Sequence, residues 1–226
     1  PDPFVVLARG RASLELAKAG SASDMQKEVD DTKKFMNMLL KLEPNNFDAF
    51  WHLAHAELLQ GEIEDNAGII GAREDSVKRA EAIIQESIDK NPEMAEPYVN
   101  MLKLKILESR SGKTSADVKA TIEEQYQKVK EKFPDNAEID YVMAGFYYKN
   151  PLDIDKAVKL IDDAVEKEPE DYDYVFRASM INYMKYCLSG EKVKWVDEAI
   201  RLAKSALELP EAQHTTGPKE ARNNNN

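Results

Sequence analysis

The sequence contains little cysteine and no long apolar run. Its 226 residues include one cysteine, Cys187, which excludes an intramolecular disulfide and a cysteine-based zinc cluster. No stretch approaches the roughly 18 consecutive apolar residues that a transmembrane helix needs, so we expect no direct membrane insertion. A single cysteine is also typical of a reducing compartment, which favours the cytoplasm.

Basic residues are scarce relative to acidic ones. Lysine and arginine total 31 and aspartate and glutamate total 42, which gives a net charge of −11. Binding to a phosphate backbone needs clustered basic side chains, so nucleic acid is not an expected partner. Glycine and proline are also sparse, with 9 and 10 residues, while 42% of the chain is apolar. This composition is typical of a helix-rich protein with a sizeable core.

Five of the prolines recur at similar intervals. They lie 48, 42, 35 and 41 residues apart, at Pro44, Pro92, Pro134, Pro169 and Pro210. Each follows an amphipathic run with helical periodicity and precedes another such run. Because proline cannot continue a helix but suits the turn into the next one, the prolines divide the chain into successive helix pairs.

The residues around each proline also repeat. Small or apolar residues recur 12, 8 and 5 positions before it, a spacing that places them on one helix face. The best examples are Ala80, Ile84 and Ser87 before Pro92, and Ala157, Ile161 and Ala164 before Pro169. Six positions after each proline an aromatic or apolar residue is expected. Asp140 departs from that pattern.

This skeleton resembles the tetratricopeptide repeat, most closely between Asp135 and Pro169, where Met143, Ala144, Tyr147, Ala157, Ile161 and Ala164 occupy the family's positions. The resemblance implies an all-α fold, a right-handed superhelical solenoid of about five antiparallel helix pairs. We expect one helical repeat domain over residues 1–211 and a polar flexible tail over residues 212–226. The expected pairs are residues 4–44, 45–92, 93–134, 135–169 and 170–210.

The spacing exceeds the family period of about 34 residues, and the excess falls between the two helices of a pair. We therefore expect lengthened helix hairpins in pairs three and five. For pair two, the glycines around Ile69 and Ile70 predict a long ordered loop between extended helices, with both isoleucines buried in that loop. The alternative is an exposed contact point.

In this family, set positions of the first helix of each pair line a concave groove. The resemblance therefore implies a partner-binding surface made of Trp51, His55, Leu58, Val99, Lys103, Ile106, Tyr141, Tyr148, Phe176, Met180 and Tyr183. Aromatic and methionine side chains offer large, adaptable contact areas. The alternative is that these side chains pack against the neighbouring repeat.

No pattern in the sequence indicates catalysis, a metal or a cofactor. His52 and His55 share a helix three residues apart, but no third ligand lies nearby in the sequence. Ser111-Gly112-Lys113-Thr114 lacks the first glycine and the preceding strand of a phosphate-binding loop. We therefore expect a protein that is not an enzyme, with no catalytic residues, no metal site and no cofactor.

The resemblance implies a protein–protein interaction scaffold that binds a partner peptide or helix in its aromatic-rich concave groove. The alternative is a structural spacer or self-association domain, fused to a catalytic or membrane-linked region outside this sequence. The apolar start at Phe4, Val5, Val6 and Leu7 favours this alternative, since it suggests that something packs before it.

Overall fold

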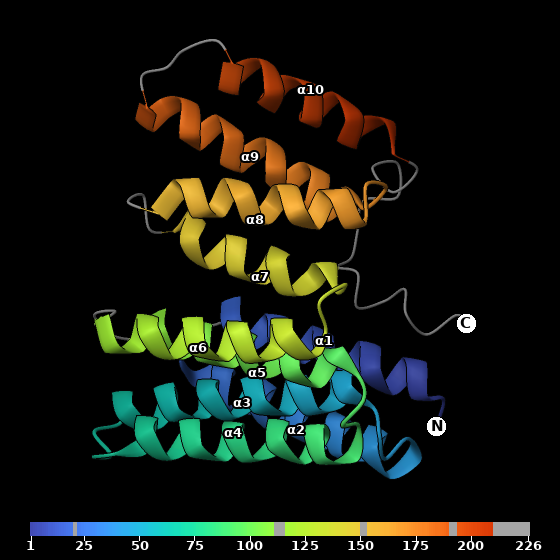
Figure 1. Ribbon diagram of the computed structural model, residues 1–226. Helices are drawn as coiled ribbons and strands as arrows, with labels where there is room; N and C mark the ends of the chain where they lie inside the picture. Colours follow the sequence, from blue (N-terminus) through green and yellow to red (C-terminus); the bar gives the residue numbers. More distant parts are fainter. Residues whose placement is uncertain (20–21, 111–115, 150–152, 190–193, 210–226) are drawn as a thin grey trace. The chain divides into compact units, whose positions relative to one another are not determined.

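The computed structural model describes residues 1–19, 22–110, 116–149, 153–189 and 194–209, and within these ranges the regular structure is helical (Figure 1). The predicted all-α class is confirmed. The helices are α1 (Pro3–Ala19), α2 (Ala22–Leu42), α3 (Phe47–Asn66), α4 (Ala72–Lys90), α5 (Ala95–Arg110), α6 (Ala116–Lys132), α7 (Ala137–Tyr148), α8 (Ile154–Lys167), α9 (Tyr172–Ser189) and α10 (Lys194–Glu208). The predicted tail over residues 212–226 lies outside the described residues, as does the segment Ser111–Thr114.

The chain divides into two compact units, Pro1–Ile122 and Glu123–Asn226. The first contains α1 to α5 and the start of α6, and the second contains the rest of α6 and α7 to α10. Within each unit, consecutive helices pack as sequential pairs: α1 with α2 and α3 with α4, then α7 with α8 and α9 with α10 (Figure 1). None of the helices in the described ranges has the length and apolar content needed to cross a membrane.

Helices α3, α5, α7 and α9 each begin shortly after a repeat proline, and in three of them a side chain two residues beyond that proline caps the helix. Asn46 Oδ1 accepts a hydrogen bond from the backbone N–H of Ala49 at 2.9 Å. Asn136 and Asp171 accept from the backbone N–H three residues later, at 3.2 and 3.0 Å. These caps satisfy N–H groups that have no partner within the helix. The repeat proline and the capping residue that follows it therefore determine where each of these helices begins.

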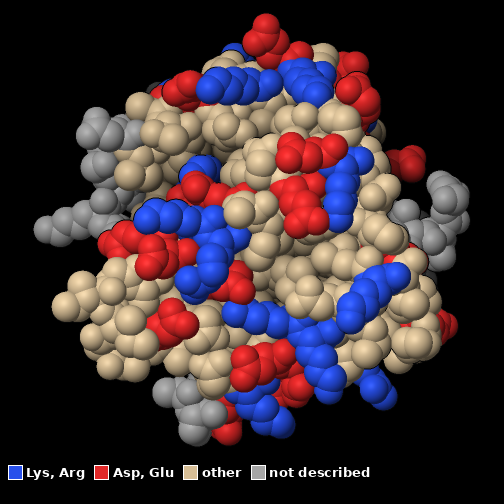
Figure 2. Space-filling model, turned by 90° about the horizontal axis from the view of Figure 1, so that it is seen from below, with Lys and Arg blue, Asp and Glu red and all other residues tan. Residues whose placement is uncertain are grey.

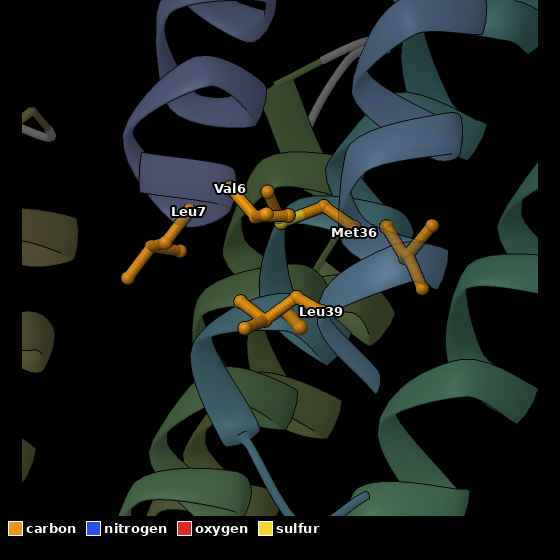
Figure 3. Packing of buried hydrophobic residues seen from close by; sticks show 6 residues of the cluster. Val6, Leu7, Met36 and Leu39 are labelled. Atoms are coloured by element: carbon orange, nitrogen blue, oxygen red, sulfur yellow. The ribbon is translucent and has the colours of Figure 1, made fainter. Parts of the chain in front are cut away.

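The repeated positions before the prolines form the core, as the sequence predicts. Ala80, Ile84 and Ser87 of α4 are fully buried, and the corresponding residues of α2 and α8 are buried in the same way. At the start of the chain, Val6 and Leu7 of α1 pack with Met36 and Leu39 of α2 (Figure 3). Because the same positions before the prolines are buried in successive pairs, the repeat identified in the sequence is also the repeat of the structure.

In pair two the expected extended helices are present, but the expected long loop with buried isoleucines is wrong. The extra residues extend the helices, because α3 has 20 residues and α4 has 19. Only residues 67–71 connect them, with Gly68 and Gly71 at φ of +82° and +80°. A connection this short cannot fold back over the helix ends, so Ile69 is exposed and Ile70 is 99% exposed. The alternative, an exposed apolar point, describes this hairpin.

The prediction of lengthened hairpins in pairs three and five is confirmed. Helices α5 and α6 have 16 and 17 residues, and α9 and α10 have 18 and 15. In pair four, which has nearly the family period, α7 and α8 have 12 and 14 residues. The added helical turns therefore account for the longer period.

Gly61 allows the long helices α3 and α4 to approach closely. A Cβ atom placed on Gly61 would lie 2.5 Å from Ser76 Cβ, which is closer than carbon atoms can pack. Gly145 in α7 offers a contrast, because a Cβ placed there meets no atom within 4 Å. The close packing of α3 on α4 therefore requires a residue without a Cβ atom at position 61, whereas position 145 has room for one.

We predict that Gly61→Ala destabilises the protein while Gly145→Ala stabilises it. Overpacking at position 61 costs about 1 to 3 kcal/mol, which exceeds the roughly 1 kcal/mol that alanine contributes through helix propensity. At position 145 only the propensity gain applies. Urea denaturation followed by circular dichroism measures both. A stabilising Gly61→Ala would contradict the close approach.

Candidate protein-binding surface

Helix α9 carries a strip of exposed aromatic and methionine side chains. Phe176, Met180 and Tyr183 are 45%, 39% and 56% exposed. Their spacing of four and three residues places them on one helix face. Tyr172 extends the strip by one turn, since its ring stacks on Phe176 at 5.6 Å between centroids and 8° between planes. We call Tyr172, Phe176, Met180 and Tyr183 the α9 strip.

The other side of α9 supplies the core of its unit. Tyr174, Ala178 and Ile181 are buried, with at most 2% of any of them exposed. The helix therefore buries one apolar face and still presents a second one to solvent. Since other residues of α9 already supply the core, the α9 strip is not needed to hold α9 in place.

Tyr141 of α7 belongs to the packing between α7 and α9. Its ring centroid lies 4.8 Å from that of buried Tyr174. The Arg177 guanidinium lies 5.3 Å from the same ring and donates a hydrogen bond to Tyr141 Oη at 3.2 Å. Tyr141 and Tyr148, at the end of α7, are both half-buried. Tyr141 thus offers only part of its ring to a partner.

In the first unit the predicted residues divide into two groups. Val99 and Ile106 of α5 are buried, and Trp51 of α3 is nearly so. Trp51 packs in a core cluster with Ala54, Ala80, Ile84, Met101 and Leu104. These three side chains contribute to packing, whereas His55, Leu58 and Lys103 are half-buried and reach the surface.

A small hollow lies beside the partly exposed residues of the first unit. Its volume is about 200 Å³, and its lining includes His55 and Leu58 of α3, Arg73 and Val77 of α4, and Leu107 of α5. Lys103 lies 5.7 Å from the centre of the Trp51 ring, so its ammonium shields that indole. The hollow is too small for a drug-sized ligand but suits a single apolar side chain.

The two histidines of α3 are held neutral, His52 as a buried side chain and His55 as a half-buried one. Arg11 Nε donates to His52 Nε2 at 3.1 Å, and Arg11 Nη2 donates to Asp48 at 3.1 Å. Burial, and then the charge of Arg11, lower the pKa of His52 to about 3. Burial lowers the pKa of His55 to about 4, with a smaller contribution from Lys18. The residues described include no cluster of histidine, cysteine or carboxylate side chains that could hold a metal ion.

A buried ion cluster around Asp140 organises the second unit. The Asp140 carboxylate is fully buried and accepts hydrogen bonds from Lys130 of α6, from Lys167 of α8 at 2.7 Å and from Tyr126 Oη at 3.0 Å. Lys167 also donates to the Pro134 carbonyl at 2.8 Å. Burial, followed by the charge of Asp140, raises the pKa of Tyr126 far above its usual value, so its hydroxyl remains a donor.

In the first unit, an aromatic ring occupies the position that corresponds to Asp140. Phe50 occupies the position of Asp140, six residues after a repeat proline. Lys90, two residues before the next proline, lies 4.9 Å from the Phe50 ring centre and donates to the Pro44 carbonyl at 3.4 Å. The departure at Asp140 therefore has a reason that the sequence interpretation missed. The available signal was the lysine repeated two residues before Pro92 and Pro169.

A larger, polar hollow lies in the second unit, outside the predicted site. Its volume is about 450 Å³, and its lining includes Glu123, Tyr147, Lys156 and Lys159. Tyr147 Oη donates to Glu123, and Lys156 Nζ lies 3.2 Å from the same carboxylate. Figure 2 likewise shows acidic and basic side chains interspersed on the face that it presents, with no region of one sign. Charges that pair in this way do not make a strong anion or cation site.

We predict that Asp140→Asn lowers the free energy of unfolding by about 3 kcal/mol, because it leaves two partly buried ammonium groups without their shared carboxylate. The matched control is Glu124→Gln, which removes the carboxylate of an exposed ion pair with Lys128. That change should have little effect. Chemical denaturation measures both variants, and equal effects would contradict the role given to Asp140.

We predict that His52 and His55 make the fold less stable as the pH falls from about 6.5 towards 4. The pKa of each is lowered in the folded protein, so the unfolded chain binds more protons in this window, and the free energy of unfolding must decrease. Urea midpoints at about pH 7 and about pH 5 measure this loss. The loss should be smaller in His52→Gln/His55→Gln, and an equal loss would show that neither histidine contributes.

Comparisons with known proteins place the fold. No family model matches the sequence, and no curated protein matches it. Among solved structures, a thermophilic tetratricopeptide-repeat (TPR) protein of Thermus thermophilus aligns with a TM-score of 0.53 at 15% identity, covering 89% of this chain and 92% of that one.

Structures of MamA also align with the chain. One has 17% identity and a TM-score of 0.45, covering 84% of this chain and 94% of its own. MamA from Desulfovibrio magneticus RS-1 has 12% identity and a TM-score of 0.45, covering 91% and 97%. The fold assignment rests on the Thermus protein, whose TM-score is above 0.5. The helices of this chain pack as sequential pairs in the predicted register. Together with the alignment to the Thermus protein, this shows a tetratricopeptide-repeat-like fold.

Proposed function

We propose that this chain is a non-catalytic protein–protein interaction module whose partner peptide or helix binds along the α9 strip. The strip carries the proposal, because it exposes Phe176, Met180 and Tyr183 on a helix whose other face already supplies the core. Aromatic side chains contribute large contact area at low entropic cost, and they are enriched among residues that dominate binding energy. The TPR-like fold suggests the same role, since such folds commonly scaffold protein contacts.

The other predicted residues have different parts in this proposal. Tyr141 contacts Arg177 of α9, Tyr148 lies two turns further along α7, and both are half-buried. His55, Leu58 and Lys103 offer a second contact area in the first unit, beside the hollow that accepts one apolar side chain. Three of the predicted residues support the surface indirectly, because they are buried and hold α3 and α5 in place: Trp51, Val99 and Ile106.

The chemistry of the strip defines the partner that it suits. A helix or extended segment with apolar residues at matching spacing would cover Phe176, Met180 and Tyr183 together. Met180 adapts its shape more readily than the neighbouring rings, which lets the strip accept irregular side chains. The net charge of −11 favours basic segments by long-range attraction.

We predict that Phe176→Ala/Tyr183→Ala weakens partner binding at least tenfold, because truncating one aromatic anchor typically costs about 2 kcal/mol. Proteins captured from the source lysate by the unchanged chain are identified by quantitative mass spectrometry. The purified partner is then titrated against both forms by calorimetry. Since the two side chains are exposed, the helical circular dichroism of the variant should be unchanged.

The matched control is Ile69→Ala/Ile70→Ala, which removes exposed apolar side chains from the α3–α4 hairpin in the other unit. This control should retain the partner that the α9 variant loses. Equal capture by the α9 variant and the unchanged chain would contradict the proposed site. Failure of the unchanged chain to capture any protein specifically would contradict the proposed function.

A further inference from the structure

One face of α10 exposes an apolar seam that no other described part of the chain covers. Val196, Ile200, Ala203 and Leu207 follow one another at intervals of four, three and four residues, which is the spacing of a helix–helix seam. Ile200 is 50% exposed and Leu207 is 69% exposed. The adjacent face, with Ala199, Leu202 and Ala206, is buried.

In earlier pairs the same repeat positions are covered by the first helix of the following pair. Leu40 of α2 packs on a cluster that includes Ala49 and Leu53 of α3. Ile88 of α4 packs on a cluster that includes Met101 and Leu104 of α5. Both lie four residues before a repeat proline, and Leu207 corresponds to them after the one-residue shift of the last pair.

The comparison with α8 is the most direct. Val158 of α8 corresponds to Ile200 of α10, and it is only 8% exposed because α9 packs against α8. Val165 corresponds to Leu207 and is half-buried. The α10 seam therefore corresponds to the face that the next helix covers in earlier pairs, and among the described residues Ile200 and Leu207 of this seam stay exposed.

The outer face of α1 has complementary features. Helix α1 packs Val6, Leu7, Leu14 and Ala17 into the cores that it shares with α2 and α3. Its other side exposes Val5 and Leu16, with the exposed Ala8 and Ala12 between them. The spacing of three, four and four residues forms a second seam, here with small side chains at its centre. Bulky residues on one helix pack well against small residues on another.

We propose that copies of this chain associate head to tail, with the α10 seam of one copy packed on the α1 seam of the next. The occupant is a second copy because α1 is a helix of the same repeat type that covers the corresponding face in earlier pairs. The two seams are different surfaces, so the contact is heterologous, and each added copy presents a fresh seam. This inference does not depend on the α9 strip.

Sedimentation equilibrium of the full chain from about 1 to about 500 µM tests the proposal. The weight-average mass should rise with concentration beyond twice the chain mass of 25.6 kDa. Ile200→Glu/Leu207→Glu, which blocks the α10 seam, and Val5→Glu/Leu16→Glu, which blocks the α1 seam, should each remain monomeric. An equimolar mixture of the two variants should form a dimer and nothing larger, because one intact contact remains.

The control Ile70→Glu changes an exposed isoleucine outside both seams and should associate like the unchanged chain. Circular dichroism confirms that each variant keeps its helices. A monomeric unchanged chain over the whole concentration range would overturn the proposal. Dimers of either seam variant alone would also overturn it, because they would show that like surfaces pair. If the mixture remained monomeric, the α1 and α10 seams would not be partners.

Discussion

The fold depends on one recurring contact, the covering of each second helix by the first helix of the next pair. A helix pair alone leaves an apolar face exposed, and stacking neighbours removes that face from water. In the first unit, α3 and α5 cover α2 and α4 in this way, through Leu40 and Ile88. Burying apolar surface contributes about 25 cal/mol per Å², so each contact of this kind adds to the stability of the array.

The same contact constrains the polar groups near it. Where Phe50 fills the position after the proline, Lys90 lies against its ring, and where Asp140 fills it, Lys130 and Lys167 supply the countercharges. A buried carboxylate is tolerated only when such partners are present. The lysine two residues before the next proline can contact either an aromatic ring, as Lys90 does, or a carboxylate, as Lys167 does. The same repeat position can therefore hold an aromatic ring or an anion.

The sequence predicted the features that depend on neighbouring residues. The division of the chain by the repeat prolines and the buried face of Ala157, Ile161 and Ala164 follow from local periodicity, and the structure has them. The α3–α4 connection could not be read in this way. Gly61 and Ser76 approach closely, and this contact joins residues of different helices that local periodicity does not relate. Ile69 and Ile70 are consequently exposed at a short turn.

Predicting the binding surface met a different difficulty, because helices such as α5 and α9 are apolar on more than one side. Periodicity cannot then show which apolar face is covered, so Val99 is buried while Phe176 is exposed at a similar place in its helix. The structure separates two kinds of exposed apolar surface. The seams of α1 and α10 contain aliphatic residues and alanine, like the cores between helices, which suits a helix of the same repeat. The α9 strip contains aromatic rings and methionine, which suits a partner of another kind.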